Sequence, residues 1–256
     1  MPELSLEHLS KTYRSSSQVV PTLADVSLTA APGAFVSIIG PSGCGKSTLF
    51  NLIVGLEEPD SGQICLDGQP LRQRAGRFGY MPQRDLLLPW RTILNNVILG
   101  PELAGEDTRA ARREAADLLP MFGLAGFGNA YPATLSGGMR QRAALLRTFL
   151  CHRDIMLFDE PFGALDALTR RELQDWLLGV WQRFGKTILF ITHDVEEALY
   201  LSDRVVVMSA RPGRVLLDMP VSLPRPRAPE MLLAPEMTAQ KGRLLAMLGA
   251  TAKTLT

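Results

Sequence analysis

The segment Gly40-Pro-Ser-Gly-Cys-Gly-Lys46-Ser47 decides the fold of this 256-residue chain. It matches the pattern G-x-x-x-x-G-K-[ST] and follows the apolar run Ala34–Ile39, which has the character of a buried strand. A helical pattern comes next, and its apolar face carries Leu49, Leu52, Ile53 and Leu56. Glycines allow positive φ, so such a loop can wrap its backbone N–H groups around an anion at the positive end of the helix. A plain glycine turn in a βα unit is the alternative, but the flanking strand and helix favour a nucleoside triphosphate site.

The loop residues have distinct predicted contacts with such a nucleotide. Lys46 would place its charge on the β- and γ-phosphates, and the Ser47 hydroxyl would bind Mg²⁺. Thr48 would add a contact to the α-phosphate. The predicted nucleotide contacts of this segment are Gly40, Pro41, Ser42, Gly43, Cys44, Gly45, Lys46, Ser47 and Thr48.

Two carboxylates follow a second buried run, 154–158. The carboxyl ends of parallel strands gather ligands and catalytic groups beside the phosphate loop. We therefore expect Asp159 to hold Mg²⁺ through its waters and Glu160 to act as the general base on a nucleophilic water. His193 follows the next strand pattern, 187–191, and could donate to a γ-phosphate oxygen or hold the attacking water. A solvated carboxylate pair and a structural histidine are the alternatives.

Composition excludes several classes of protein. Hydrophobic residues make up 46% and charged residues 21%, which is ordinary globular usage, so collagen-like, disordered and coiled-coil chains are excluded. The 27 Lys and Arg against 26 Asp and Glu give a net charge of +1, so we expect no nucleic-acid partner. The three cysteines lack metal-ligand spacing and fit a reducing compartment. No uncharged apolar run reaches the ~20 residues that span a bilayer, and the first residues lack a secretory pattern. We expect an intracellular chain that acts at a membrane only through a partner.

Strand and helix patterns alternate along most of the chain, which predicts an α/β fold. The region before the phosphate loop and the strand Gln63–Leu66 indicate antiparallel β structure, and Asp67-Gly68 is typical of a hairpin turn. Helical patterns replace strands over about 85–150, and strands return at 154–158, 187–191 and 204–208. We predict a P-loop NTPase core with a mostly parallel sheet, an antiparallel β subdomain at the N-terminus and an inserted α-helical subdomain. Residues 1–222 would form this domain, and the Pro- and Arg-rich 223–256 a linker with a short helical tail.

A second anion-binding pattern lies inside the helical region, at Leu135-Ser-Gly-Gly-Met-Arg-Gln141. Ser136 is well placed as an N-cap, and Gly137 and Gly138 expose backbone N–H groups at the start of the following helix. Taken alone, the pattern is equally consistent with an ordinary capped helix.

Together these motifs make the chain resemble the nucleotide-binding subunits of ABC transporters over about residues 4–218. Gly40 to Ser47 is similar to Walker A, Leu135 to Gln141 to the signature and Asp159-Glu160 to Walker B. The resemblance implies that Gln83 is the Q-loop glutamine at the Mg²⁺ site. It also implies that Gly163 to Asp166 is the D-loop, that His193 is the switch histidine and that Tyr13 stacks on adenine. Met139 departs from the family, which most often has glutamine after LSGG, but the backbone donors are unaffected.

The resemblance also implies partners. Two subunits pack head to tail in this family, so Ser136 to Gly138 of one chain would close on ATP and Mg²⁺ held by its twin, and hydrolysis would need the homodimer. The apolar stretch Leu86, Leu87, Leu88 and Trp90 lies just after Gln83. We predict that it is a socket for a short helix of an integral membrane permease, although core packing would also explain it.

The segment from Leu87 to Thr92 resembles the nitrate, sulfonate and taurine branch of bacterial ABC importers, whose relatives also carry thiamine precursors. A solute-binding protein and the permease would then choose the small solute, and the chain would sit on the cytoplasmic side of the bacterial inner membrane. Alternatives are a soluble ABC-type ATPase of translation or DNA repair, a small-molecule kinase and an exporter. ABC-type ATPases of translation or DNA repair typically have two cassettes in one chain or basic arms, and this chain has neither. A small-molecule kinase does not need the signature motif. Exporters often fuse this domain to membrane spans.

Overall fold

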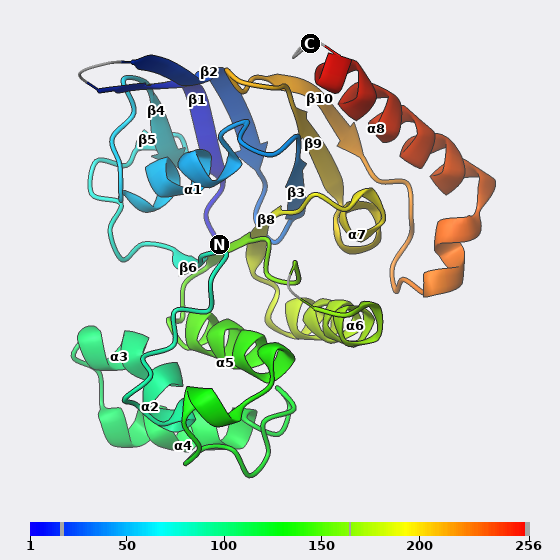
Figure 1. The fold of residues 1–256 in the computed structure, drawn as a ribbon. Coiled ribbons are helices and arrows are strands. Elements are labelled where there is room, and N and C mark those ends of the chain that lie inside the picture. Colours follow the sequence, from blue (N-terminus) through cyan, green and yellow to red (C-terminus); the bar gives the residue numbers. More distant parts are fainter. Residues whose placement is uncertain (16–17, 164, 254–256) are drawn as a thin grey trace.

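A six-stranded sheet forms the centre of the computed structural model, which describes residues 1–15, 18–163 and 165–253 (Figure 1). In spatial order its strands are β10 (Val215–Pro220), β9 (Arg204–Met208), β3 (Phe35–Ile39), β8 (Thr187–Ile191), β7 (Ile155–Asp159) and β6 (Gly79–Met81). All neighbours are parallel except the edge strand β10, which runs antiparallel to β9. Every residue of β3, β7 and β8 is buried, as expected for strands covered on both faces. The predicted mostly parallel sheet is therefore confirmed.

A four-stranded antiparallel sheet stands beside this core. Its order is β2 (Val19–Ala30), β1 (Leu4–Arg14), β4 (Ser61–Leu66) and β5 (Gln69–Pro70). Asp67 and Gly68 join β4 to β5 with φ of 49° and 73°, which is the backbone of the predicted hairpin turn. The apolar face of this sheet packs with β3 and helix α1 (Lys46–Val54) in one buried cluster.

Helix α1 ends at Val54, two residues before Leu56, the last position of the predicted apolar face. Gly55 has a φ of 80° and donates its N–H to the carbonyl of Leu52 at 3.2 Å, so the chain turns away. Leu49, Leu52 and Ile53 are buried as expected. Leu56 is 68% exposed, and its predicted place on the apolar helix face is wrong.

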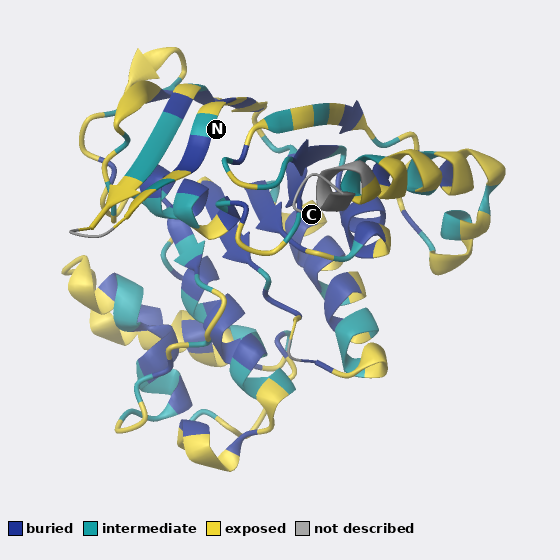
Figure 2. Cartoon of the chain, turned by 45° about the horizontal axis from the view of Figure 1, so that its top comes forward, coloured by how far each residue is buried: buried dark blue, intermediate teal, exposed yellow. Residues whose placement is uncertain are grey.

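The helical insert lies between β6 and β7, below the sheets in Figure 1. Its elements are α2 (Ile93–Val97), α3 (Leu99–Leu103), α4 (Thr108–Leu118), the 3₁₀ turn Pro132–Thr134 and α5 (Gly137–Phe149). Its buried residues share one cluster with the crossover helix α6 (Ala167–Phe184), and Phe122 packs on Trp176 of α6 with ring centroids 4.3 Å apart. The insert is thus packed on the core. Figure 2 shows its inner faces buried and its outer loops exposed.

The C-terminal residues pack on the outside of the core. They form the 3₁₀ segment Pro229–Leu233 and the helix α8 (Pro235–Lys253), which at 19 residues is longer than the short tail helix predicted. Buried Met237 and Leu244 share a cluster with β9 and with α7 (Val195–Leu201). No helix in the described ranges combines the length and the apolar character needed to span a membrane.

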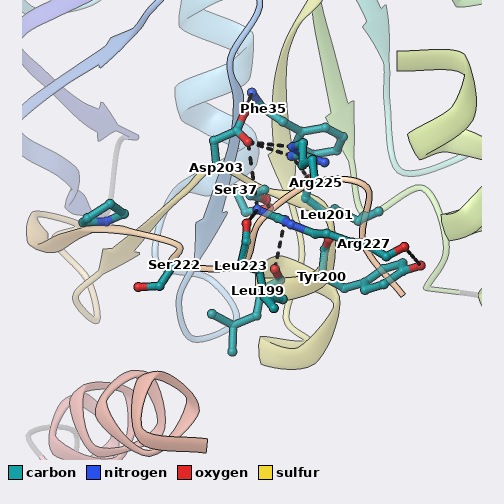
Figure 3. A network of polar contacts seen from close by, with 12 residues as sticks. Phe35, Ser37, Leu199, Tyr200, Leu201, Asp203, Ser222, Leu223, Arg225 and Arg227 are labelled. Carbon is teal, nitrogen blue, oxygen red and sulfur yellow. Dashed lines mark hydrogen bonds and ion pairs between the residues drawn. The ribbon is translucent and has the colours of Figure 1, made fainter. Parts of the chain in front are cut away.

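Two arginines attach the start of this tail to the core (Figure 3). Arg225 donates from Nη2 to the Asp203 carboxylate at 2.7 Å, and Asp203 also accepts the backbone N–H of Phe35 at 2.9 Å. Arg227 is buried and donates from Nη1 to the carbonyls of Leu199 and Tyr200 at 3.1 and 2.8 Å. The tail therefore shares a carboxylate with the first residue of β3.

Candidate functional site

A pocket of about 300 Å³ opens over the phosphate loop, at the carboxyl end of β3. This is the edge at which parallel sheets bind ligands. The residues that line it are Ser42, Gly43, Gly45, Lys46, Ser47, Thr48, Gln83, Glu160 and Arg211. Eight of these nine are predicted site residues, and Arg211 is not among them.

The start of α1 is left open to an external anion. Gly45 precedes the helix with a φ of 108° and has no side chain to cap it. Side chains cap five other helix starts, whereas that of the short α3 is also uncapped. The capped helices are α2, α4, α5, α6 and α7, through Thr92, Asp107, Ser136, Asp166 and Asp194. A Cβ at Gly45 would lie 2.7 Å from the Leu23 Cδ2 atom, so only glycine fits this turn. The uncapped N–H groups at the positive helix end favour phosphate.

Lys46 is the buried cation of the pocket. Only 6% of it is exposed, and its Nζ donates to the carbonyls of Gly40 and Pro41 at 2.8 and 3.1 Å. The two carbonyls satisfy the ammonium group, and its flexible stem is long enough to reach an anion in the pocket.

Ser47 and Asp159 form a pair of hard oxygen ligands. The Asp159 carboxylate is 3% exposed and accepts a hydrogen bond from the Ser47 hydroxyl. Burial raises the pKa of Asp159, and the Ser47 hydrogen bond opposes that shift. The pair fits a divalent cation that is also bound by phosphate oxygens. The described residues contain no cluster of three or more His, Cys, Asp or Glu that could hold a metal ion.

Three polar side chains converge where β6, β7 and β8 end side by side. The Glu160 Oε2 atom accepts from Gln83 Nε2 at 3.2 Å and lies 3.5 Å from His193 Nδ1. Glu160 has a φ of 47°, a left-handed conformation that is uncommon for glutamate and typical of residues held at functional sites. Its N–H donates to the Ile191 carbonyl at 3.0 Å, so β8 fixes this turn. The arrangement places one carboxylate between an amide and an imidazole at the pocket edge.

Tyr13 lies on β1 next to the start of α1. Its hydroxyl donates to Glu57 Oε2 at 2.5 Å and lies 3.4 Å from the Thr48 hydroxyl. Burial, followed by the hydrogen bond to Glu57, raises the pKa of Tyr13. Since 39% of the residue is exposed, its ring is partly open to a ligand next to Thr48.

The signature segment begins α5 away from this pocket. Ser136 caps the helix as predicted, since its Oγ accepts the N–H of Met139 at 3.2 Å. Ser136 and Gly137 are exposed, and a Cβ at Gly138 would lie 2.9 Å from Thr169 Cγ2 of α6, so glycine permits close packing there. None of these three residues lines the pocket over the phosphate loop. The two predicted anion-binding elements thus lie apart in one chain.

Residues 23–163 match the family described as ABC transporter. The chain belongs to this family. It is 46% identical to the formylaminopyrimidine import ATP-binding protein ThiZ of Halalkalibacterium halodurans, over 87% of this chain and 86% of that protein. It is 44% identical to the taurine import ATP-binding protein TauB of Rhizobium johnstonii, over 83% and 82%. A solved post-hydrolysis dimer of an ATP-binding cassette bound to ADP and Pi matches 86% of this chain and 99% of its own, with a TM-score of 0.76 and 31% identity. The resemblance and the fold class predicted from the motifs are confirmed.

The predicted D-loop, Gly163 to Asp166, precedes α6. Asp166 caps that helix by accepting the N–H of Thr169 at 3.0 Å, and this hydrogen bonding lowers the pKa of its carboxyl. Gly163 lines the space around Glu160, His193 and Arg170, whereas Ala164 lies outside the described residues. The cap leaves Asp166 exposed at the surface.

The predicted permease socket is partly core and partly surface in this cassette. Leu87 is 8% exposed and packs in the cluster of the helical insert. Leu86 and Trp90 are 52% and 72% exposed, and Leu88 is intermediate. The stretch therefore has an apolar outer side that rests on a buried leucine.

Two arginines of α5 hold the segment after Gln83, and no local pattern predicts this role for them. Arg147 donates from Nη1 to the Leu86 carbonyl at 2.8 Å and also bonds the Asp85 carbonyl. Arg140, within the signature helix, bonds the Asp85 carboxylate at 3.2 Å. Only the folded insert brings these positions together, about 55 to 62 residues apart in the chain. Arg211 was missed because it too meets its partner only in the folded chain, 168 residues from Gly43.

Proposed function

We propose that this chain is the ATP-hydrolysing energy-coupling subunit of a bacterial importer, working with a separate integral membrane permease. The observation that carries the proposal is the meeting of Gln83, Glu160 and His193 at the edge of the phosphate-loop pocket. A nucleotide held by Lys46 and the start of α1 would present its γ-phosphate to these side chains.

In the proposed reaction, Glu160 accepts a proton from a water that attacks the γ-phosphorus in line. The new P–O bond forms from the water oxygen, and the bond to the β–γ bridging oxygen breaks, with its electron pair leaving on ADP. Lys46 and His193 stabilise the charge that spreads over the γ-phosphate oxygens. Ser47, Asp159 and Gln83 would hold Mg²⁺, which would neutralise charge between the β- and γ-phosphates.

The placement of Ser136 to Gly138 supports an ATP-dependent homodimer. These residues form an exposed, capped helix start that does not line the pocket of their own chain. A second copy arranged head to tail would bring its Ser136–Gly138 over the nucleotide, as the dimeric form of the solved cassette suggests. Asp166 would lie at the same interface.

The relatives support an importer. The taurine and formylaminopyrimidine proteins both carry "import" in their names, and the chain covers more than four fifths of each. We infer a small solute of taurine-, sulfonate- or nitrate-like chemistry, or one like a thiamine precursor, delivered by a solute-binding protein. Leu86, Leu88 and Trp90 would receive a permease helix, which would hold the subunit on the cytoplasmic side of the inner membrane.

The Glu160→Gln variant tests this proposal. The amide still fills the turn but cannot accept the proton, so hydrolysis should fall about 10²- to 10⁴-fold, as is usual for loss of a general base. ATP should still bind, and analytical ultracentrifugation with ATP and Mg²⁺ should show a stable dimer. Glu172→Gln removes the same charge from an exposed ion pair with Arg142 and serves as the matched control. Normal turnover by E160Q would refute the assigned base, and a purely monomeric E160Q would refute the dimer.

A further inference from the structure

The turn between β9 and β10, residues 209–214, lies directly against the phosphate loop. Gly213 donates its N–H to the Thr22 carbonyl at 2.8 Å and accepts the N–H of Ala24 at 3.0 Å, so β2 holds the turn from one side. A Cβ at Gly213 would lie 2.2 Å from the Cys44 carbonyl oxygen. This close backbone contact fixes the turn to the loop that receives phosphate.

The turn is also closed by its own hydrogen bonds. The Ser209 Oγ atom donates to the Pro212 carbonyl at 3.0 Å and accepts the N–H of Arg214 at 2.9 Å. The Ser209 N–H donates to the Arg214 carbonyl at 2.9 Å. The backbone at Arg211 is therefore held in place before any ligand binds, which lowers the entropy cost of using its side chain.

The Arg211 guanidinium lies beside Gly43 of the phosphate loop. Its Nε donates to the Gly43 carbonyl at 3.0 Å, and its Nη2 lies 3.4 Å from the position of a Cβ on Gly43. Arg211 lines the pocket together with Lys46. Within the described ranges, neither Nη atom of Arg211 has a protein hydrogen-bond acceptor or carboxylate partner. Two N–H-bearing nitrogens of a fixed cation are thus available at the edge of the pocket.

We propose that Arg211 binds the polyphosphate of the nucleotide, as a second cation that reaches the phosphate loop from the β9–β10 turn. This inference rests on the proposed nucleotide binding. A guanidinium matches phosphate oxygens through paired N–H donors, and its weak hydration makes this contact favourable at a partly open site. Lys46 belongs to the helix start and Arg211 to the turn, so two separate elements would each supply one cation to the polyphosphate.

The competing explanation is that Arg211 only supports the Gly43 carbonyl. Glutamine can still donate to that carbonyl but has no charge, so Arg211→Gln separates the two roles. Arg214→Ala is the matched control, because Arg214 is an exposed arginine of the same turn that does not line the pocket.

The test is calorimetric titration of wild type, R211A, R211Q and R214A with ATP, ADP and AMP in the absence of Mg²⁺. We expect R211A and R211Q to bind ATP and ADP about tenfold more weakly, the loss of one partly exposed charged hydrogen-bonding group. AMP binding should be unchanged, and R214A should match wild type. Thermal unfolding without nucleotide shows whether each variant is folded.

Several results would overturn the inference. If R211A bound ATP as tightly as R214A does, Arg211 would contribute nothing to binding. If R211Q bound ATP as tightly as the wild type does, the positive charge of Arg211 would not be needed. An equal loss of AMP and ATP affinity would indicate a distorted loop instead of a lost phosphate contact. Failure of the wild type itself to bind ATP would refute the proposed function, and that result is distinct from all of these.

Discussion

Replacing Arg147 with alanine should lower the free energy of unfolding by about 2 kcal/mol and loosen the segment after Gln83. Arg147 bonds two backbone carbonyls of that segment, those of Asp85 and Leu86. Hydrogen bonds to a charged donor are worth roughly 1.5–3 kcal/mol each, or about 3–6 kcal/mol for the pair. Burial lowers the pKa of Arg147, which shows that the cation gives up hydration to make these bonds. In the alanine variant the two carbonyls can bind water instead, so we expect the net loss in the free energy of unfolding to be about 2 kcal/mol.

Urea unfolding of the nucleotide-free protein measures this loss, and about 2 kcal/mol corresponds to roughly 4–8 °C in Tm for a domain of this size. Trp90 is exposed in the same loop and its fluorescence should report increased mobility there. Arg113→Ala is the matched control, because Arg113 is an exposed arginine on α4 of the same insert. Equal midpoints for R147A and R113A, with unchanged Trp90 fluorescence, would refute the view that Arg147 holds this segment.

Two further predictions concern buried groups next to the pocket. Burial raises the pKa of Asp159, so its negative charge destabilises the nucleotide-free protein at neutral pH. We therefore expect D159N to have a higher free energy of unfolding than wild type at neutral pH. This difference should shrink as the pH falls through the raised pKa toward 3.8, because the wild-type carboxyl then becomes neutral. Urea titrations at neutral and mildly acidic pH check this, and a D159N variant less stable than wild type at neutral pH would contradict it. Cys44 is 1% exposed, and burial raises the pKa of its thiol. A bulky maleimide should therefore label Cys44 more slowly than the partly exposed Cys151. Bound ATP should slow the labelling of Cys44 further. Mass spectrometry of the labelled protein measures both rates, and equal Cys44 labelling with and without ATP would contradict the loop geometry.

The central sheet and the pocket could be predicted because their signals are local. Continuous apolar runs mark β3, β7 and β8, and each is followed directly by the polar residues that the sheet then brings together. The Ser136 cap was predictable for the same reason, since a cap depends on the three residues after it.

Three features of the structure that the sequence did not predict correctly depend on properties that local patterns do not encode. Leu56 fits the helical period, but Gly55 ends the helix first, and a glycine's φ is not visible in a periodicity. The three-residue β6 is too short to show a period of two, and its strand character comes from pairing with β7. Arg211 lies 168 residues from Gly43, and only the closed β9–β10 turn brings the two together.

The shared carboxylate of Asp203 bears on how far the protein can be shortened. A chain cut after 222 would keep every residue that lines the nucleotide pocket, yet it would leave Asp203 without Arg225 and strip Leu223, Met237 and Leu244 from the apolar surface of α7 and β9. Asp203 also accepts the N–H of Phe35, the first residue of the strand β3 that leads to the phosphate loop, so the loss of Arg225 would affect the strand that carries this loop. The smallest fragment that contains all the chemistry is therefore not the smallest fragment that would stay folded.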